Sequence, residues 1–155
     1  MAKKTEQTPV IQNRKANHLY SVEDSLEVGI MLIGSEVKSI RDGKCNISEA
    51  WIDLDEKNGL WLVGAHIDEY LFANQFNHFP ARRRKLLAHF HEIQKLRKYK
   101  ELKGFTLIPL KMYFKNRRVK LELGICKGKN QQDRREDIKK RDAKLEIARC
   151  LRNSR

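Results

Sequence analysis

The sequence has little of what a disulfide-bonded, membrane-spanning or secreted protein needs. Its three cysteines, Cys45, Cys126 and Cys150, are odd in number and lack Cys-x-x-Cys spacing, which argues against a disulfide framework or a zinc knuckle. The longest apolar runs, at residues 30–33 and 60–63, fall far short of the ~20 residues of a transmembrane helix. No apolar stretch follows the basic N-terminal residues, so no secretory signal is expected. We expect a cytoplasmic protein without a membrane partner.

Signatures of catalysis are equally scarce. The chain contains no GxxxxGK[ST] loop that would cradle phosphates. His89-x-His91 and Asp53-x-Asp55 have a spacing that suits a metal on one strand face, but no third ligand follows at motif spacing. We therefore expect no enzyme activity, no catalytic residue, no metal and no cofactor. A metal-dependent nuclease is the enzyme alternative.

Positive charge is abundant and unevenly distributed. The 155 residues contain 33 Lys and Arg against 20 Asp and Glu, a net charge of +13. Residues 20–80 have four basic and eleven acidic side chains, whereas residues 81–155 have 25 basic and eight acidic ones. Such a polarised chain favours a nucleic acid partner, because Lys and Arg placed on phosphates release counterions. A solvated basic face without a partner is the alternative.

Apolar periodicity and turn residues predict about six strands in hairpins and two short helices. Pro109 inside a predicted strand indicates an edge position, a bulge or a bend. The fold class is mainly β with short helices, and the topology resembles a closed β-barrel of the oligonucleotide-binding type with flanking helices. The expected strands are 20–33, 51–54, 60–66, 85–88, 105–114 and 118–125, and the helices are 35–43, capped by Ser35, and 90–103.

The chain divides into three parts by composition. Residues 1–12 show no periodicity and are expected to be a disordered leader. Residues 13–126 form the RNA-binding β-barrel domain. Residues 127–155 have few large aliphatic side chains and eleven basic ones, so we expect a basic tail that is disordered when free and helical when held by a polyanion. An ordinary surface helix packed on the domain is the alternative.

Motifs along most of the chain follow one another in the order of a known family. From Asn13 to about Arg141 the series resembles the small protein B family, bacterial proteins that bind transfer-messenger RNA (tmRNA). Each motif alone is weakly specific, whereas the ordered series is highly specific. The motifs are Asn13-Arg14-Lys15-Ala16 with His18 and Tyr20; Glu27-x-Gly29; Gly34-x-Glu36-Val37-Lys38-Ser39 with Arg41, Gly43, Lys44 and Asn46; Ala65-His66-Ile67 with Tyr70; Asn77-His78 with Pro80; Arg84-Lys85-Leu86-Leu87; Pro109-Leu110; Tyr113-Phe114-Lys115-Asn116; Val119-Lys120; Lys127-Gly128-Lys129; Asp133 with Arg135; and Ile138-Lys139 with Arg141.

The resemblance implies a function in ribosome rescue. In that family the body binds the tRNA-like domain of tmRNA, and the complex enters ribosomes that have stalled without a usable codon. The tail then enters the decoding site and the vacant mRNA channel, and the incomplete peptide is tagged for degradation, a process called trans-translation. The implied partners are tmRNA, the ribosome with its rRNA and, indirectly through the charged RNA, elongation factor Tu and alanyl-tRNA synthetase. The chain is expected to be a monomer.

Residues for the RNA-binding body come from charge and from the resemblance. Folded RNA presents phosphates along a curve, so Lys and Arg from several elements are needed. By resemblance Glu27, Leu87 and Lys120 lie on this body, although a surface ion pair for Glu27 and a core position for Leu87 are alternatives. Asn77 and His78 either read base edges and 2′-hydroxyls or are simple loop residues. The predicted body residues are Arg14, Lys15, Glu27, Lys38, Asn77, His78, Arg82, Arg83, Arg84, Lys85, Leu87, Lys115 and Lys120.

A second set is expected to act on the ribosome. By resemblance His18 lies near the decoding site, with a surface histidine of no role as the alternative. The run that begins with Asp133 resembles the functional segment of the family's tail. The predicted decoding-site and tail residues are His18, Lys127, Gly128, Lys129, Asp133, Arg134, Arg135, Ile138, Lys139 and Arg141.

Some positions depart from the family pattern, and two other binding functions compete with tmRNA binding. Asn17, Phe79 and Ala88 stand where Arg, Asp and a larger aliphatic residue are expected, while Arg117 replaces a turn glycine and Lys140 an acidic residue. One rival is a ribosomal or rRNA-binding protein with a basic extension, which would accompany intact ribosomes at all times. The other is a basic scaffold for acidic proteins, which would carry no RNA.

Overall fold

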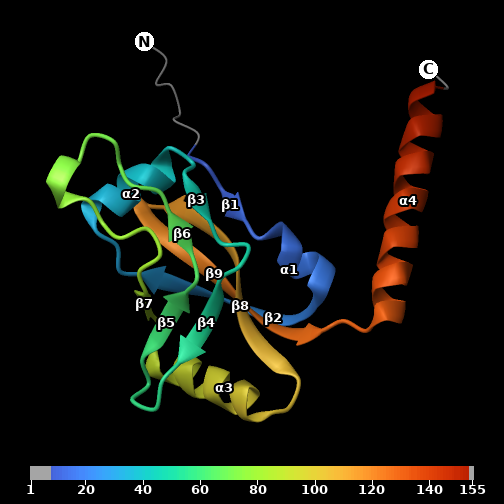
Figure 1. Cartoon of the computed structure of the whole chain (residues 1–155). Helices are drawn as coiled ribbons and strands as arrows, with labels where there is room; N and C mark the ends of the chain where they lie inside the picture. Colours follow the sequence, from blue (N-terminus) through green and yellow to red (C-terminus); the bar gives the residue numbers. More distant parts are fainter. Residues whose placement is uncertain (1–7, 154–155) are drawn as a thin grey trace.

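The computed structural model describes residues 8–153 and contains nine strands and four α-helices (Figure 1). Three strands of eleven residues dominate: β2 (Tyr20–Ile30), β8 (Phe105–Lys115) and β9 (Arg118–Gly128). The short strands are β1 (Ile11–Gln12), β3 (Cys45–Asn46), β4 (Trp51–Leu54), β5 (Leu60–Val63), β6 (His66–Ile67) and β7 (Arg84–Leu87). The helices are α1 (Arg14–Leu19), α2 (Gly34–Arg41), α3 (Phe90–Glu101) and α4 (Gln131–Asn153), and a 3₁₀ turn, η1, spans Asn74–Phe76.

Seven antiparallel strands form one sheet in the order β1-β8-β9-β2-β7-β5-β4, and β3 pairs with β6 separately. The mainly β fold with a few helices agrees with the sequence. The predicted closed barrel is not found, because no hydrogen-bonded ladder joins the outer strands β1 and β4 within residues 8–153. Strand β4 nevertheless lies against β8, so the sheet curls over its own core.

Period-two alternation gives this sheet one buried and one exposed face. On β9, the buried Leu121 and Leu123 alternate with Lys120 and Glu122, which point away from the core. Leu96 of α3 is fully buried against the same core, so α3 covers one end of the curled sheet (Figure 1). Helix α1 packs on one end of the other face, where Ala16 contacts Ile108 of β8 and Cys126 of β9.

Turn chemistry places the hairpins where the sequence predicts them. Asn58 takes a positive φ of 61° between β4 and β5, and Asn116 and Arg117 take 51° and 62° between β8 and β9. Arg117 therefore occupies a left-handed conformation that favours glycine. The register of β8 shifts between Pro109 and Lys111, which identifies a bulge as the outcome for Pro109.

Two local expectations need correction. Ser35 does not cap α2; the N-cap is Ile33, and the Glu36 carboxylate accepts its backbone N–H at 2.9 Å. The predicted strand 60–66 is interrupted at Gly64, where φ is +78° and the Trp51 ring lies 2.9 Å from the place of a Cβ. A residue with a side chain does not fit there, so β5 ends at Val63.

The N-terminal part of the sheet begins inside the expected leader. Residues 1–7 lie outside the described residues, but Ile11 and Gln12 pair with Met112 and Lys111 of β8. The Asn13 side chain then donates to the Pro109 carbonyl at 2.9 Å and accepts the Ala16 backbone N–H at 3.1 Å. This buried amide both starts α1 and fixes it against β8.

The last element, α4, extends away from the sheet (Figure 1). None of its described residues is buried, which is unusual for a helix of 23 residues. This segment is helical in the structure, while disorder of the free tail and its helical form on the ribosome stay predictions. No described helix is long and apolar enough to span a membrane.

Candidate nucleic-acid interface

The exposed face of the sheet brings together residues from four strands. In register across β8, β9, β2 and β7 lie Tyr113, Lys120, Gly29 and Leu87. Side chains two residues apart on a strand share a face, so Glu27 lies beside this row. Three residues that the resemblance singles out, Glu27, Leu87 and Lys120, therefore meet on one surface.

A shallow hollow of about 390 Å³ lies at this meeting point. Leu87 is 51% exposed, so the alternative of a core position is wrong for this residue. A Cβ at Gly29 would lie 3.3 Å from the Leu87 Cβ, which is tight, and glycine therefore leaves room for Leu87. The residues that line the hollow are Glu27, Gly29, Leu87, Ala88, His89, Glu92 and Lys120.

Glu27 is held by two residues of β8, the strand that lies beyond β9 in the sheet. The Tyr113 hydroxyl donates a hydrogen bond to its carboxylate, and the Lys115 ammonium lies 3.1 Å from Oε1. The hydrogen bonds from Tyr113 and then Lys115 hold the pKa of Glu27 below its ordinary value. Burial and the bond to Glu27 raise the pKa of Tyr113 to about 12. At neutral pH Glu27 is therefore ionised and Tyr113 remains a donor.

Cations next to this carboxylate are available for phosphates. Lys120 and Arg118 form no ion pair within residues 8–153, and both line a second hollow with Glu27, Lys115 and Asn116. Arg117 and Arg118 also border an apolar hollow beside Leu87. The tip of the β8–β9 hairpin is thus a cationic edge of the exposed face.

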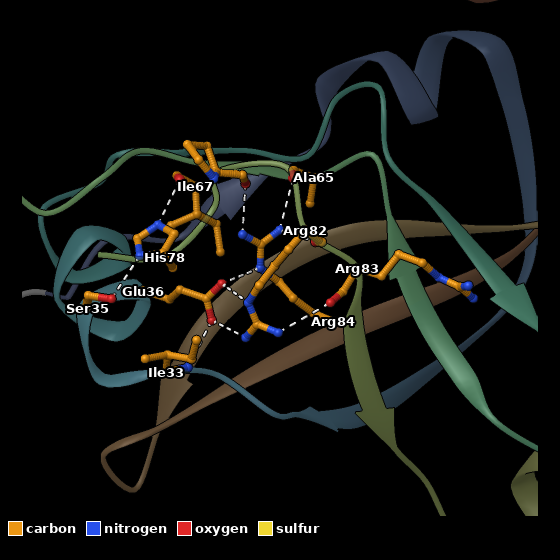
Figure 2. Close-up of polar contacts among 10 residues, drawn as sticks. Ile33, Ser35, Glu36, Ala65, Ile67, His78, Arg82, Arg83 and Arg84 are labelled. Atoms are coloured by element: carbon orange, nitrogen blue, oxygen red, sulfur yellow. Dashed lines mark hydrogen bonds and ion pairs between the residues drawn. The ribbon is translucent and has the colours of Figure 1, made fainter. Parts of the chain in front are cut away.

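The basic run 82–85 does not form one surface. Arg84 is fully buried, and its guanidinium binds the Glu36 carboxylate at 2.8 Å and the Ala65 carbonyl at 3.0 Å (Figure 2). Arg82 binds the same carboxylate at 2.6 Å. The prediction that Arg84 contacts RNA is wrong, because its side chain is completely buried and bound inside the protein. Arg82 is largely committed to the same carboxylate, whereas Lys85 is exposed.

The Arg83 side chain lies apart from Glu36, the partner of Arg82 and Arg84. Its guanidinium lies 4.9 Å from the centre of the Trp61 ring and 3.3 Å from Asp53. Trp61 belongs to β5 and Asp53 to the edge strand β4, so Arg83 lies toward that edge of the sheet. It remains half-exposed and accessible to a ligand.

The two loop residues predicted to read bases are engaged within the protein. His78 is buried; its Nε2 donates to the Ile67 carbonyl and its Nδ1 lies 2.9 Å from the Ser35 hydroxyl (Figure 2). Asn77 accepts the Tyr70 backbone N–H at 2.9 Å and donates to the Tyr70 carbonyl at 2.8 Å. For His78 the prediction of RNA contact is wrong, and for both residues the simple loop reading fits the geometry.

The remaining predicted body residues lie on helices. Arg14 and Lys15 are exposed on α1, and Lys15 pairs with Glu49. Lys38 of α2 lies 5.3 Å from the centre of the Tyr70 ring. The structure does not join these three cations to the row that contains Lys120.

The expected decoding-site residues gather where the tail leaves the sheet. His18 is exposed in the last turn of α1. Lys129 donates from its backbone N–H to the Leu19 carbonyl at 3.1 Å, and from its ammonium to the Asn17 carbonyl at 2.9 Å and to Asp137. Lys129 therefore connects α1 to α4 and is only 15% exposed.

Other tail residues face solvent. Lys127 lies over the Phe105 ring, with its ammonium 6.0 Å from the ring centre, and Gly128 ends β9. The Asp133 carboxylate accepts the Asn130 backbone N–H at 3.3 Å, which favours the start of α4. The exposed members of the predicted tail set are Asp133, Arg135, Ile138, Lys139 and Arg141, and Arg134 is half-buried.

Sequence reasoning named Arg117 and Arg118 of the hairpin as possible phosphate ligands but missed Tyr113 as a site residue. Period two gives a signal for it, because Tyr113 lies two residues before Lys115. Only the pairing of β8 with β9 and of β9 with β2 shows that Tyr113 faces Glu27. Among the described residues, no group of three His, Cys, Asp or Glu side chains is placed to hold a metal.

Comparison with known proteins now adds to this geometry. The model of the SmpB protein family matches residues 10–153. The chain belongs to the SmpB family. The SmpB family is a family of RNA-binding proteins and not of enzymes.

Relatives cover nearly the whole chain. An SsrA-binding protein of Afipia carboxidovorans is 56% identical over 145 residues, which are 92% of this chain and 91% of that protein. Those of Acetivibrio thermocellus and Bifidobacterium adolescentis are 51% and 44% identical over 152 residues each, covering 97% and 98% of this chain and 97% and 96% of those proteins. A solved structure described as "tmRNA-SmpB: a journey to the center of the bacterial ribosome" is similar with a TM-score of 0.67 and 39% identity, over 84% of this chain and 94% of that one.

Proposed function

We propose that this chain binds the tRNA-like domain of tmRNA through the exposed face of β8, β9, β2 and β7, and delivers it to stalled ribosomes for trans-translation. The names of its SmpB relatives support the ligand. The observation that carries the location is the meeting of Glu27, Leu87 and Lys120 on one surface. All three are residues that the family resemblance places on the RNA-binding body.

The chemistry of this surface suits folded RNA. Lys120 and Arg118 supply phosphate ligands from β9, and Lys115 adds a third cation from β8. Leu87 offers an apolar patch on which a ribose or base edge packs. The A-form minor groove is wide and shallow, so a sheet face with short protruding side chains fits it better than a deep cleft does. The oligonucleotide-binding type of this sheet is part of the proposal.

The tail is proposed to act at a later step. Its exposed cations, with His18 nearby on α1, suit the decoding site and the empty mRNA channel, both of which are built of rRNA. Lys129 sets the direction in which α4 leaves the body. Elongation factor Tu and alanyl-tRNA synthetase are indirect partners through the charged tmRNA, and the protein acts in the cytoplasm as a monomer.

Binding of purified chain to tmRNA, intact tRNA and an rRNA fragment at physiological salt tests this function. Four proteins are compared: the wild type, Lys120→Ala, a chain that ends after Asn130, and Lys57→Ala. Lys57 is an exposed lysine in the β4–β5 turn and is the matched control. We expect selective binding of tmRNA that weakens about five- to tenfold in Lys120→Ala and is unchanged in Lys57→Ala and in the shortened chain.

Equal binding to every RNA contradicts the proposal and leaves a generic basic RNA binder. Binding to rRNA alone favours a ribosomal protein, which is the second candidate. Equal loss in Lys120→Ala and Lys57→Ala contradicts the proposed location, because it means that net charge alone determines affinity.

A further inference from the structure

Glu27 is an acidic residue in the middle of a surface proposed to bind a polyanion. Its carboxylate lies among Lys115, Lys120 and Arg118, and it lines both hollows of the exposed face. Glu122, which lies opposite Glu27 in the register of β2 and β9, is paired with Lys111 at 2.9 Å. A carboxylate repels phosphate, so Glu27 must either serve the protein alone or bind some other part of the RNA.

The geometry around Glu27 leaves room for a ligand. Tyr113 and Lys115 approach its carboxylate from β8, while Leu87 and Lys120 lie across the hollow. An ionised carboxylate has about four lone-pair sites and only accepts hydrogen bonds. The bonds from Tyr113 and Lys115 leave acceptor capacity unused, and 37% of the Glu27 side chain is exposed.

Tyr113 is itself fixed in place. The Lys111 ammonium lies 5.5 Å from the centre of its ring, and Lys111 is in turn paired with Glu122. Tyr113 lies opposite Lys120 in the register of β8 and β9. Its hydroxyl donates to Glu27, which leaves the carboxylate in one orientation.

We propose that Glu27 reads a hydrogen-bond donor of the RNA, a 2′-hydroxyl or an exocyclic amino group, and that Tyr113 is the positioning residue that holds the carboxylate for it. The inference rests on the proposed function and names the chemistry of the same site. The minor groove of RNA displays both donors, the 2′-hydroxyl on every ribose and the amino group on guanine. Phosphate ligands such as Lys120 fix the register, and Glu27 adds selectivity.

The substitution Glu27→Gln distinguishes donor reading from a purely electrostatic effect, because the two predict different changes in RNA affinity. Glu27→Gln removes a negative charge from a cationic face, so electrostatics alone predicts equal or tighter binding of RNA. Donor reading predicts about tenfold weaker binding of tmRNA, because a charge-assisted hydrogen bond is lost. The control is Glu56→Gln, an exposed glutamate in the β4–β5 turn, whose effect on affinity we expect to be small. Unchanged or tighter binding by Glu27→Gln overturns the proposal.

A double-mutant cycle tests Tyr113. Tyr113→Phe is expected to weaken tmRNA binding about three- to tenfold in the wild type and hardly at all in the Glu27→Gln background, because Tyr113 acts through Glu27. The salt dependence of binding should stay unchanged, since no phosphate contact is removed. Tyr70→Phe in the loop before η1 is the matched control. Equal losses in both backgrounds overturn the positioning role, and thermal melting verifies that every variant is folded.

Modified RNA identifies which donor is read. The tRNA-like domain is prepared with 2′-deoxy substitutions or with inosine in place of guanosine, which removes the amino group. One substitution should weaken binding by the wild type but not by Glu27→Gln. If no modification distinguishes the two proteins, the donor-reading role is overturned. A wild type that shows no preference for tmRNA instead contradicts the proposed function, so the two failures are distinguishable.

Discussion

Four consecutive basic residues, Arg82 to Lys85, lie in three different surroundings in this fold. Arg84 is buried on Glu36, and Arg82 shares the same carboxylate. Arg83 stacks on Trp61, while Lys85 is exposed in the middle of β7. At the scale of single residues, a run of positive charge is therefore not a row of phosphate ligands. Alternation along a strand places neighbouring side chains on opposite faces of the sheet, and the buried carboxylate of Glu36 binds the inward-facing Arg84.

Arg84 and Lys85 form a matched pair for a stability measurement. Arg84→Met removes one of two guanidinium groups on a buried carboxylate, and we expect it to lower the free energy of unfolding by about 3–5 kcal/mol. Lys85→Ala is expected to change it by less than about 0.5 kcal/mol, since that side chain is exposed. Urea unfolding measures both values. A similar small loss in both variants would show that the Glu36 pair contributes little to stability.

Glu36 also predicts how the fold responds to acid. Burial alone raises the pKa of this carboxyl, but hydrogen bonds from Arg82, the Ile33 backbone and Arg84 more than offset it, so the pKa lies below its ordinary value of 4.5. A carboxyl with a lowered pKa in the folded state stabilises the protein above the unfolded pKa and loses this effect as pH falls through the folded pKa.

We therefore expect the melting temperature to be nearly constant from pH 7 to about pH 5 and to fall below it. Glu36→Gln should melt lower than the wild type at pH 7 and show a shallower fall in acid. Circular dichroism melts across this range check both expectations. Parallel acid profiles for the two proteins would assign acid unfolding to other carboxylates.

At the scale of elements, the loop between β6 and β7 is built around two polar residues. Asn77 closes it on both backbone groups of Tyr70, and His78 anchors it to Ser35 and Ile67. These bonds turn the neighbouring aromatic side chains outward, and Phe76 and Phe79 are 79% and 71% exposed. A polar residue in a loop thus indicates an internal anchor as readily as an RNA contact.

His78→Ala tests this assignment. We expect it to lower the free energy of unfolding by about 1–3 kcal/mol, because the Ser35 hydroxyl and the Ile67 carbonyl lose their partner. The affinity of the remaining folded protein for tmRNA should be unchanged. Gln75→Ala, at an exposed position in η1, is the control. A selective loss of RNA affinity without a loss of stability would restore His78 to the binding surface.

The α4 helix represents the opposite case, an element without a core. It buries none of its described side chains, and its link to the body runs through Lys129, Asn17 and Asp137. Helices of this kind are marginal in water, because few contacts offset the ordering of the backbone.

A chain that ends after Asn130 should melt within about 1–2 °C of the full-length protein, because a loss of about 0.5 kcal/mol or less is expected at a surface without buried contacts. The difference between their circular dichroism spectra reports the tail. We expect its helical signal to fall gradually on heating, well before the cooperative transition of the body. A common sharp transition, together with a large loss on truncation, would mean that α4 packs on the domain after all.

At the scale of the whole molecule, the uneven distribution of charge along the sequence produces a cationic edge on the folded protein. Lys120 and Arg118 lie at the β8–β9 hairpin and form no ion pair with any residue from 8 to 153, whereas several other cations are paired with carboxylates of the acidic region 20–80, as Lys95 is with Asp24. Net charge therefore overstates the number of phosphate ligands.

The salt dependence of tmRNA binding reports how many cations of the protein contact phosphates. Lys120→Ala and Arg118→Ala should each reduce the slope of log affinity against log salt concentration by about one. Lys95→Ala, which removes a cation already paired with Asp24, should leave the slope nearly unchanged. Fluorescence anisotropy with labelled tmRNA from low to physiological salt measures the slopes. Equal slopes for all three variants would contradict a localised phosphate-binding edge.

Much of this protein follows from the sequence alone. Local patterns predicted the six longer strands but not β1 and β3, because alternation and turn residues such as Asn58 and Asn116 act over a few neighbours. The ordered motifs indicated the family, and with it the prediction that Glu27 and Lys120 bind RNA. These signals are short-range or carried by residue identity, so they needed no coordinates.

Tertiary structure decided which of the chemically similar residues are available. Only the pairing of β7 with β2 leaves Leu87 exposed beside Gly29, and only the fold of α2 against β7 places Glu36 on Arg84. Likewise, the pairing of β8 with β9 and of β9 with β2 brings Tyr113 to Glu27, 86 residues away in the chain. Burial and partnership depend on segments that are distant in sequence, and the cost of burying an unpaired charge then determines which cations stay at the surface.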